Sequence, residues 1–560
     1  MSSSSLATAT STTGFFNFRK PEAIVRLESF FVLACSRPRR TAFSLLDAAN
    51  PFSALFRYSR FDDSDMPTAS AEHPMTAILL NGRPIQTHDG RADMTNFEMD
   101  LFDTRMSEVK VEKDKDLDDD GMSKKRFCNP CGSSRNRIIK PACVPISIVS
   151  LLIIALVFLP LFNEEDLASP IKLTTGCTAE CKSYLVESIP TGVPFPTENH
   201  TAEAWIRIIE ETQQYLDISV MYWNLNTSDY ESAVYGRRVY EALIRAGRRG
   251  VKIRIAQDGA SNLSDNEESA YLARSGLAEV REINVTRLIG SGIIHTKFIL
   301  SDISTLYIGS ANMDWKSLSE VKEVGVVVEK CPCVASDLYK IFAAYWKLGE
   351  NGTVVPDKWP ISYRTPFNFS NMARSSPAQF NPKGREHDLA AIQKIIGAAR
   401  ESVCISVMDY IPATLYMKNN RFWPDIDDAL RDAAYRGVHV RMLISHWDHS
   451  RKEMLPFLQS LQDIGEGVPS INGTRRGRVE VRIFTVPPGG KEKIPFTRVN
   501  HAKYMVTEDI AYIGTSNWSG DYFISTAGVA MVVRQPASTK RLQAVFDRDW
   551  NSLYAKPLAM

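Results

Sequence analysis

The sequence predicts an α/β protein built from two repeated halves that face one another with pseudo-two-fold symmetry. Helices and strands alternate in the same order in residues 163–360 and 361–560, which is typical of helices packed on a sheet. A polar segment, which we call the repeated phrase, also occurs twice, as HTKFILSDISTLYIGSAN at 295–312 and as HAKYMVTEDIAYIGTSN at 501–517. Because a repeated sequence indicates a repeated structure, we expect two α/β sandwiches, one in each half.

Each half follows the order helix, strand, helix, strand, repeated phrase, strand. The opening helix and strand are 202–214 with 215–223 in the first half, and 388–401 with 402–410 in the second. The second helix of each half ends in Arg-Gly, so Gly250 and Gly437 have the position of helix C-caps before the next strand. The halves meet near residues 350–385, which are rich in Pro, Asn and Ser.

Before these halves the sequence predicts a cytosolic tail, 1–140, and one transmembrane helix, 141–162. The tail is Ser/Thr-rich at its start and carries interspersed charges, so we expect it to be largely disordered. The span has about 20 apolar positions without a charge, which disfavours a buried core helix. It begins too far from the N-terminus for a cleaved signal peptide. Basic residues precede it at 124–140 and three acids follow it at 164–166, which predicts a type II membrane protein with both halves in the lumen.

Glycosylation sequons agree with that orientation, because every Asn-x-Ser/Thr triplet follows the predicted span. The expected sites are Asn199, Asn226, Asn262, Asn284, Asn351, Asn368 and Asn472. Asn517 also begins a triplet, but we exclude it because it belongs to the repeated phrase and is expected to be buried.

Four lumenal cysteines are expected to form two disulfides. One close pair is Cys177 and Cys181, and the other is Cys331 and Cys333. Because Cys331-Pro-Cys333 is too tight to close easily on itself, we expect bridges between the pairs, with the connectivity left open. Cys404, in an apolar strand pattern, is expected to remain a buried thiol.

The repeated phrase carries the residues for phosphate chemistry. His295 and Lys297 correspond to His501 and Lys503, and in each copy the two side chains are two positions apart, on one face of a strand. A histidine can act as nucleophile or proton donor near neutral pH, and a lysine supplies a point charge for phosphoryl oxygens. Asn312 and Asn517 can donate to the same oxygens. A lone histidine is usually structural, but duplication of the whole set points to one two-sided catalytic site.

The two phrases match the HxKxxxxD motif, so the chain resembles the phospholipase D superfamily over roughly residues 170–556. The surrounding words GSANMDWKSL and YIGTSNWSGDYF, together with the membrane anchor, are similar to the endolysosomal branch. The resemblance implies that His295 attacks phosphorus to give a phosphohistidine and that His501 is the acid and base. It implies that Lys297, Lys503, Asn312 and Asn517 bind the phosphoryl oxygens, and that no metal or other cofactor is required.

Three acidic residues have less certain roles. Asp302 and Glu508 stand an odd number of positions after the lysines, so they would point away from the phosphate on a straight strand. We expect a turn before them and a role in orienting or tuning groups near the site. Glu508 departs from the Asp of the motif. Glu323 matches an acid that orients the catalytic histidine in the superfamily, and the alternative is an exposed strand charge.

The branch resemblance implies a 5′-to-3′ exonuclease on single-stranded DNA and RNA that releases nucleoside 3′-phosphates in the endosome and lysosome, after passage through the endoplasmic reticulum and Golgi. The net charge of +1 fits binding of a few nucleotides at a strand end better than binding along an extended basic surface. Aromatic side chains that could stack bases are Tyr222, Trp223, Trp315, Trp518 and Tyr522, with core packing as the alternative for each. Phospholipid hydrolysis or transphosphatidylation and an inactive membrane glycoprotein are the other functions considered, and a homodimer is kept open as the assembly.

Overall fold

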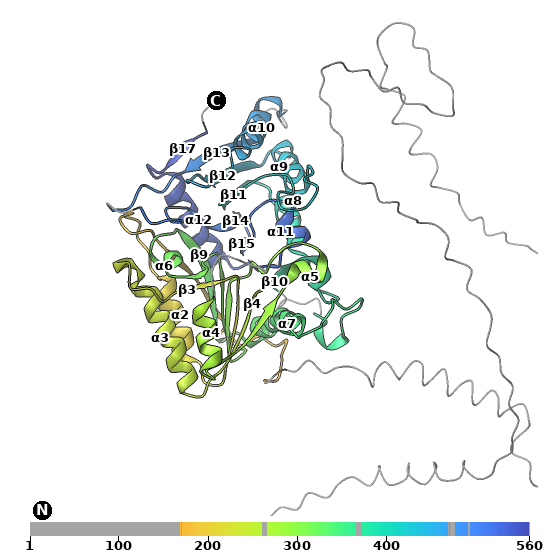
Figure 1. Ribbon diagram of the computed structural model, residues 1–560. Helices are drawn as coiled ribbons and strands as arrows, with labels where there is room; N and C mark the ends of the chain where they lie inside the picture. Colours follow the sequence, from red (N-terminus) through yellow and green to blue (C-terminus); the bar gives the residue numbers. More distant parts are fainter. Residues whose placement is uncertain are drawn as a thin grey trace, which may run out of the picture. The chain divides into compact units, whose positions relative to one another are not determined.

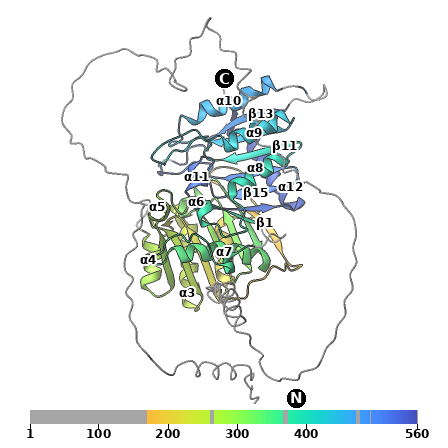
Figure 2. The same ribbon diagram turned by 90° about the vertical axis from the view of Figure 1, so that its right-hand side faces the viewer.

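The computed structural model describes residues 169, 171–259, 266–365, 372–468, 470, 477–490 and 493–558. These residues form two mixed β-sheets, each covered by helices (Figures 1 and 2). The predicted tail, 1–140, and transmembrane helix, 141–162, lie outside them. Within the described part of the chain, no helix has the length and apolar character needed to cross a membrane.

The two sheets have the same strand order, except that β17 at the edge of the second sheet has no counterpart in the first. The first has the order β1-β9-β7-β6-β2-β4-β5, and the second has the order β10-β16-β15-β14-β11-β12-β13-β17. The strands of the first are β1 (Lys182–Ser188), β2 (Tyr215–Val220), β4 (Lys252–Asp258), β5 (Ala278–Ile283), β6 (Phe298–Ser301), β7 (Thr305–Gly309) and β9 (Glu323–Glu329). Those of the second are β10 (Ala373–Ser376), β11 (Ser402–Val407), β12 (His439–Ser445), β13 (Arg478–Phe484), β14 (Lys503–Thr507), β15 (Ala511–Gly514), β16 (Gly528–Val533) and β17 (Ala555–Pro557). The short strands β3 (Trp223–Asn224) and β8 (Met313–Asp314) pair separately. The predicted α/β class and its internal repeat are therefore confirmed.

Helices cover the outer face of each sheet. In the first half these are α2 (Thr201–Glu211) and α3 (Val234–Arg248), and in the second they are α8 (Asp388–Ala398), α9 (Asp425–Tyr435) and α10 (Met454–Gly467). The remaining helices are α4 (Glu267–Arg274), α5 (Val285–Ile289), α6 (Trp315–Ser319), α7 (Pro332–Leu348), α11 (Asp521–Ile524) and α12 (Pro536–Trp550). Gly250 and Gly437 follow α3 and α9 with φ of 89° and 92°, as the Arg-Gly pattern predicted.

A single apolar core lies between the two sheets. It takes alternate residues from the central strands, for example Phe298 and Leu300 of β6 and Tyr504 and Val506 of β14, together with α7 and α12. The intervening residues, such as Ile299, pack against the outer helices. Burial on both faces explains why these strands are almost wholly apolar.

Two short crossings join the halves at the site. The amide of His295 donates to the carbonyl of Ala527 at 2.8 Å, and the amide of His501 donates to the carbonyl of Lys322 at 2.8 Å. The Lys322 ammonium is buried in an ion pair with Asp549 of α12, at 2.6 Å. Each histidine is therefore fixed against the opposite half.

The cysteines behave as expected. Disulfides join Cys177 to Cys333 and Cys181 to Cys331, which ties the segment before β1 to the start of α7. This settles the connectivity that the sequence left open. Cys404 is a buried free thiol in β11.

The predicted glycosylation sites fall into two groups. Asn226, Asn284 and Asn351 are exposed and Asn199 is half-buried. The other three, Asn262, Asn368 and Asn472, lie outside the described residues. Asn517 is buried, which agrees with its exclusion.

Candidate active site

The repeated phrases bring two histidines to one pocket, whereas Lys297 and Lys503 are buried behind them and are not among the residues that line it. His295 and Lys297 stand just before β6, and His501 precedes β14, which begins at Lys503. Each ammonium donates to the carbonyl of its own histidine, at 2.8 Å for Lys297 and 2.5 Å for Lys503. His295 and His501 both line a cavity of about 260 Å³ on the seam between the halves. Histidines far apart in the sequence thus face one small space.

His501 is paired with a carboxylate from the other half. Its Nδ1 lies 2.9 Å and 3.0 Å from the two carboxylate oxygens of Glu323, at the start of β9. The hydroxyl of Ser317 donates to the same carboxylate at 2.9 Å. Burial alone would raise the pKa of Glu323, but His501 and Lys503 lower it below its ordinary value. The buried carboxylate is therefore ionised and holds the His501 ring with Nε2 free for chemistry. Glu323 is no exposed strand charge.

His295 has different surroundings. The amide of Ser310 donates to Val324, and in the second half the amide of Thr515 donates to Val529, so the counterpart of Glu323 is Gly528. A Cβ at Gly528 would lie 2.2 Å from the hydroxyl of Ser516, which leaves no space for a carboxylate there. Within the described part of the chain, no carboxylate lies at ion-pair distance from His295.

The aromatic ring of Tyr522 packs edge-on against His295 instead, with ring centroids 5.1 Å apart. Tyr522 comes from α11 of the second half, so each histidine is again contacted by the half that does not supply it. His295 therefore has an aromatic neighbour where His501 has an acid.

Burial and the crowding of cations shape the protonation of the site. Burial, Lys297 and Lys503 hold the pKa of His295 well below its ordinary value. Burial also lowers the pKa of His501, but Glu323 opposes that shift. Burial lowers the pKa of Lys503 to about 7 and that of Lys297 well below its usual range. A bound phosphodiester anion would stabilise the charged forms of both lysines. An anionic ligand therefore stabilises this site more than a neutral one.

One of the two asparagines lines the pocket and the other lies behind it. Asn312 lines the pocket beside Tyr222, whose hydroxyl donates to Asp314 at 2.9 Å. The amide of Asn517 donates to Asp409 and to the hydroxyl of Tyr522, each at 3.2 Å. Asn517 is not among the lining residues, but its contact with Tyr522 places it behind the aromatic neighbour of His295.

Asp302 and Glu508 follow β6 and β14 where the chain turns, as predicted, but they lie away from the histidines, so the role predicted for them near the site is wrong. The Asp302 carboxylate accepts the amides of Gln213, Gln214 and Tyr215 at 2.8–2.9 Å. These amides lie at the start of β2, at the end of the sheet away from His295, because β2 and β6 are antiparallel. Glu508 likewise accepts the amides of Arg400 and Ser402, at the start of β11. Both acids fasten neighbouring strands, which is a structural role.

Three of the five predicted stacking residues are core residues. Trp223, Trp315 and Trp518 are 0%, 2% and 1% exposed, so they cannot stack on a substrate base. Tyr222 lines the pocket, and Tyr522 contacts His295.

Sequence reasoning missed two aromatic residues at the pocket, Trp447 and Phe496. Trp447 follows β12 by two residues and Phe496 precedes His501 by five. The signal for Trp447 was its place just after a strand that leads to the site, and that for Phe496 was its place in the connection that leads to His501.

One group of metal-ligand side chains occurs within the described ranges. It consists of Cys177, Cys331 and Cys333, whose sulfurs form the two disulfides with Cys181. No step of the chemistry is assigned to it.

Two facing histidines, each with a lysine and an asparagine, define a phosphodiesterase of the two-histidine class. Residues 196–488 match the family model described as "PLD3/4, PLD-like domain". The chain is 77% identical over 527 residues to "Probable phospholipase D F09G2.8" of Caenorhabditis elegans, covering 90% of this chain and 93% of that protein. It is 40% identical to "5'-3' exonuclease PLD3" of Homo sapiens, covering 72% and 86%. It is also 40% identical to "Phospholipase D Z" of Dictyostelium discoideum, covering 67% and 90%. The chain belongs to the phospholipase D superfamily, in the branch that this model describes, and it is a phosphodiesterase.

Proposed function

We propose that the chain is a 5′-to-3′ exonuclease on single-stranded DNA and RNA that works through a phosphohistidine. The observation that carries the mechanism is that one pocket holds two histidines with unlike partners, a carboxylate for His501 and none for His295. The support for a nucleic-acid substrate is the 40–42% identity to several relatives named 5'-3' exonuclease.

His295 is the nucleophile. Its lowered pKa keeps the imidazole neutral, which leaves a ring lone pair for attack on phosphorus. As the nitrogen–phosphorus bond forms, the bond from phosphorus to the 5′ oxygen of the departing strand breaks. His501, whose protonated form Glu323 favours, gives its Nε2 proton to that oxygen.

The second step reverses the proton flow. His501 takes a proton from water, the water oxygen attacks phosphorus, and the nitrogen–phosphorus bond breaks. The products are a nucleoside 3′-phosphate, neutral His295 and a protonated His501 ready for the next cycle. Asn312 and Asn517 donate to the non-bridging oxygens, and Lys297 and Lys503 stabilise their charge.

An acidic lumen suits this site. With a pKa of about 7, Lys503 carries its charge below neutral pH and loses it above, before any phosphate is bound. We propose that the protein is a type II membrane protein whose catalytic part reaches the endosome and lysosome. The support is the apolar span at 141–162 with its flanking charges and one-sided sequons.

The test is a digest of single-stranded oligonucleotides with a free 5′-hydroxyl by the detergent-solubilised protein at acid pH. We expect stepwise release of nucleoside 3′-phosphates, detected by mass spectrometry, and their loss in His295→Ala. A 5′-blocked oligonucleotide should resist. Attack from the 3′ end or products with 5′-phosphates would contradict the proposal.

Phospholipid turnover is the second candidate. Two of the relatives, including the one 77% identical, carry the name phospholipase D. Incubation with labelled phosphatidylcholine vesicles and a primary alcohol separates the two functions. Phosphatidyl transfer without oligonucleotide cleavage would favour the lipid function.

A further inference from the structure

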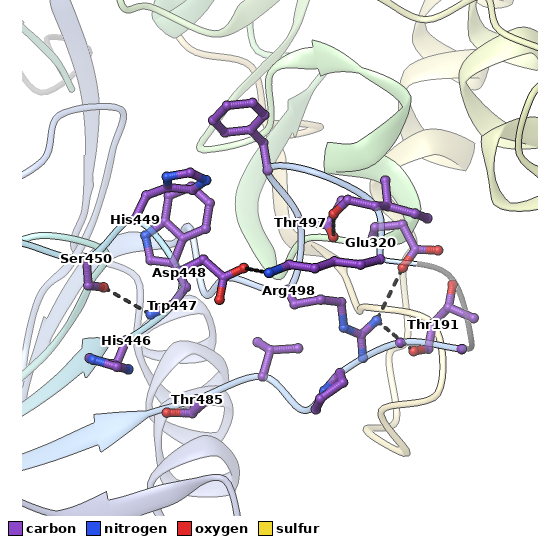
Figure 3. Close-up of a pocket in the computed structure, with 17 residues that line it drawn as sticks. Thr191, Glu320, His446, Trp447, Asp448, His449, Ser450, Thr485, Thr497 and Arg498 are labelled. Atoms are coloured by element: carbon purple, nitrogen blue, oxygen red, sulfur yellow. Dashed lines mark hydrogen bonds and ion pairs between the residues drawn. The ribbon is translucent and has the colours of Figure 1, made fainter.

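A larger pocket opens beside the catalytic one (Figure 3). Its volume is about 740 Å³, and its walls come mainly from the segments 446–450, 485–490 and 493–498 of the second half (Figure 3). Trp447 and Phe496 line both pockets, so the two spaces adjoin at these rings. We call the larger one the Trp447 pocket.

The Trp447 pocket lies on the side of His501. Thr497 and Arg498, which lead into His501, form part of its wall, and Glu320 stands close to Glu323 in sequence. The connection from β13, which ends at Phe484, to His501 is longer than the one from β5, which ends at Ile283, to His295. The extra length in the second half supplies much of this wall.

The walls of the Trp447 pocket offer aromatic planes, and a cation lies next to them. Phe496 is 61% exposed, and the ring of His449 stacks on it with centroids 4.7 Å apart and planes 14° apart. Trp447 meets His449 edge-on at 4.7 Å. The Lys316 ammonium lines the neighbouring catalytic pocket, 5.9 Å from the Phe496 ring and 3.6 Å from the carboxylate of Asp314. Exposed rings next to a cation are the features by which proteins hold single-stranded nucleic acid.

The other charges of the pocket are also paired. Lys493 contacts Asp448 at 2.6 Å, and Arg498 contacts Glu320 at 3.2 Å and the carbonyl of Thr191 at 2.9 Å (Figure 3). Arg498 therefore fastens the wall to the first half. A pocket with paired charges and open rings suits bases better than a row of phosphates.

We propose that the Trp447 pocket binds the first nucleotides of the departing strand, on the 3′ side of the scissile phosphate. The inference rests on the proposed function, in which His501 protonates the 5′ oxygen of that strand. The departing strand must then leave on the side of His501, where the Trp447 pocket lies. Lys316, at the junction of the two pockets, is placed for the next phosphate along the strand.

The test compares Phe496→Ala, Phe496→Trp and Lys316→Gln with Tyr435→Ala, an exposed aromatic of α9 away from the pocket. The substrates are a ten-nucleotide single strand and bis(p-nitrophenyl) phosphate, which has no departing strand. Loss of one stacking ring should raise KM for the oligonucleotide about 5- to 150-fold, with much smaller changes in kcat. Phe496→Trp should lower that KM.

Several outcomes separate the two levels of the proposal. Equal KM increases for both substrates in Phe496→Ala, or an oligonucleotide KM no different from that of Tyr435→Ala, would overturn the strand pocket while the exonuclease stands. Failure of the wild-type protein to cut any oligonucleotide would overturn both.

Discussion

The two catalytic histidines stand at matching places in matching halves, yet their surroundings differ. His501 has the carboxylate of Glu323, whereas His295 packs against the ring of Tyr522 and Gly528 stands at the position that corresponds to Glu323. The strand order, the lysine contacts and the backbone crossings are the same on both sides. A symmetric scaffold therefore carries an asymmetric site, and the asymmetry supports the proposed roles of His295 as nucleophile and His501 as acid.

The largest effect should come from removing each histidine in turn. Both His295→Ala and His501→Ala should lower kcat on an oligonucleotide about 10⁴-fold or more. Bis(p-nitrophenyl) phosphate should tell them apart, because nitrophenolate departs without a proton. With that substrate His501→Ala should accumulate a phosphoenzyme, seen by intact-protein mass spectrometry, whereas His295→Ala should not.

Both variants must first give the melting temperature of the wild-type protein, so that loss of activity is not loss of folding. A phosphoenzyme in His295→Ala and none in His501→Ala would reverse the assignment. The different surroundings of the two histidines would then need another explanation.

Removal of the carboxylate should come next. Glu323→Gln is expected to lower kcat about 10³-fold, because the neutral amide no longer favours protonated His501 or fixes its tautomer. The carboxylate raises the pKa of His501, so its loss lowers that pKa, and the alkaline limb of the kcat profile should move to lower pH. A pH series of kcat checks both statements.

Glu329→Gln, at the far end of the same strand, is the matched control. Its carboxylate pairs with Arg207 at the surface, so kcat and the pH profile should stay near those of the wild type. If the alkaline limb of the kcat profile does not shift in Glu323→Gln, then Glu323 does not tune the proton donor His501.

The repeat explains how far the sequence alone could go. The duplicated His, Lys and Asn located the site, and the alternation of helices and strands predicted two α/β halves. The partner of His501 could be suspected only by resemblance, because Glu323 comes from the other half and no spacing relates it to residue 501. Gly528 gave no signal, since a glycine acts here by the space it leaves.

The aromatic residues show the same limit. The sequence around a tryptophan next to a catalytic motif is the same whether its ring enters the core or the pocket. Trp315 and Trp518 stand next to the repeated phrases, and their rings pack in the core. Trp447 follows β12, outside either phrase, and the packing of the strands brings its ring to the pocket. Only the packing of the halves decides which rings are free.

The third prediction tests why the second half lacks a carboxylate. Gly528→Ala would place a Cβ 2.2 Å from the Ser516 hydroxyl and 2.9 Å from that of Ser376, both buried. Overpacking of this kind should lower the free energy of unfolding by about 1–3 kcal/mol. Gly397→Ala is the control, because Gly397 is an exposed position of α8 with nothing near its Cβ, and the change should be neutral or stabilising by about 1 kcal/mol. Urea denaturation measures both, and equal stability of the two variants would show that space does not exclude a side chain at 528.

The smallest effects on kcat are expected for Asp302 and Glu508, the two acids that the motif predicted near the site. The Asp302 carboxylate accepts three backbone amides at 2.8–2.9 Å, whereas Glu508 accepts two, at 2.6 Å and 3.4 Å. Asp302→Ala should therefore cost about 2 kcal/mol of unfolding free energy and Glu508→Ala about 1 kcal/mol. Because both acids lie at the ends of their strands away from the histidines, kcat per folded molecule should stay within about threefold of the wild type. A fall in kcat comparable to that of Glu323→Gln would return these acids to the catalytic machinery. A larger loss of stability in Glu508→Ala than in Asp302→Ala would contradict the ranking of the two halves.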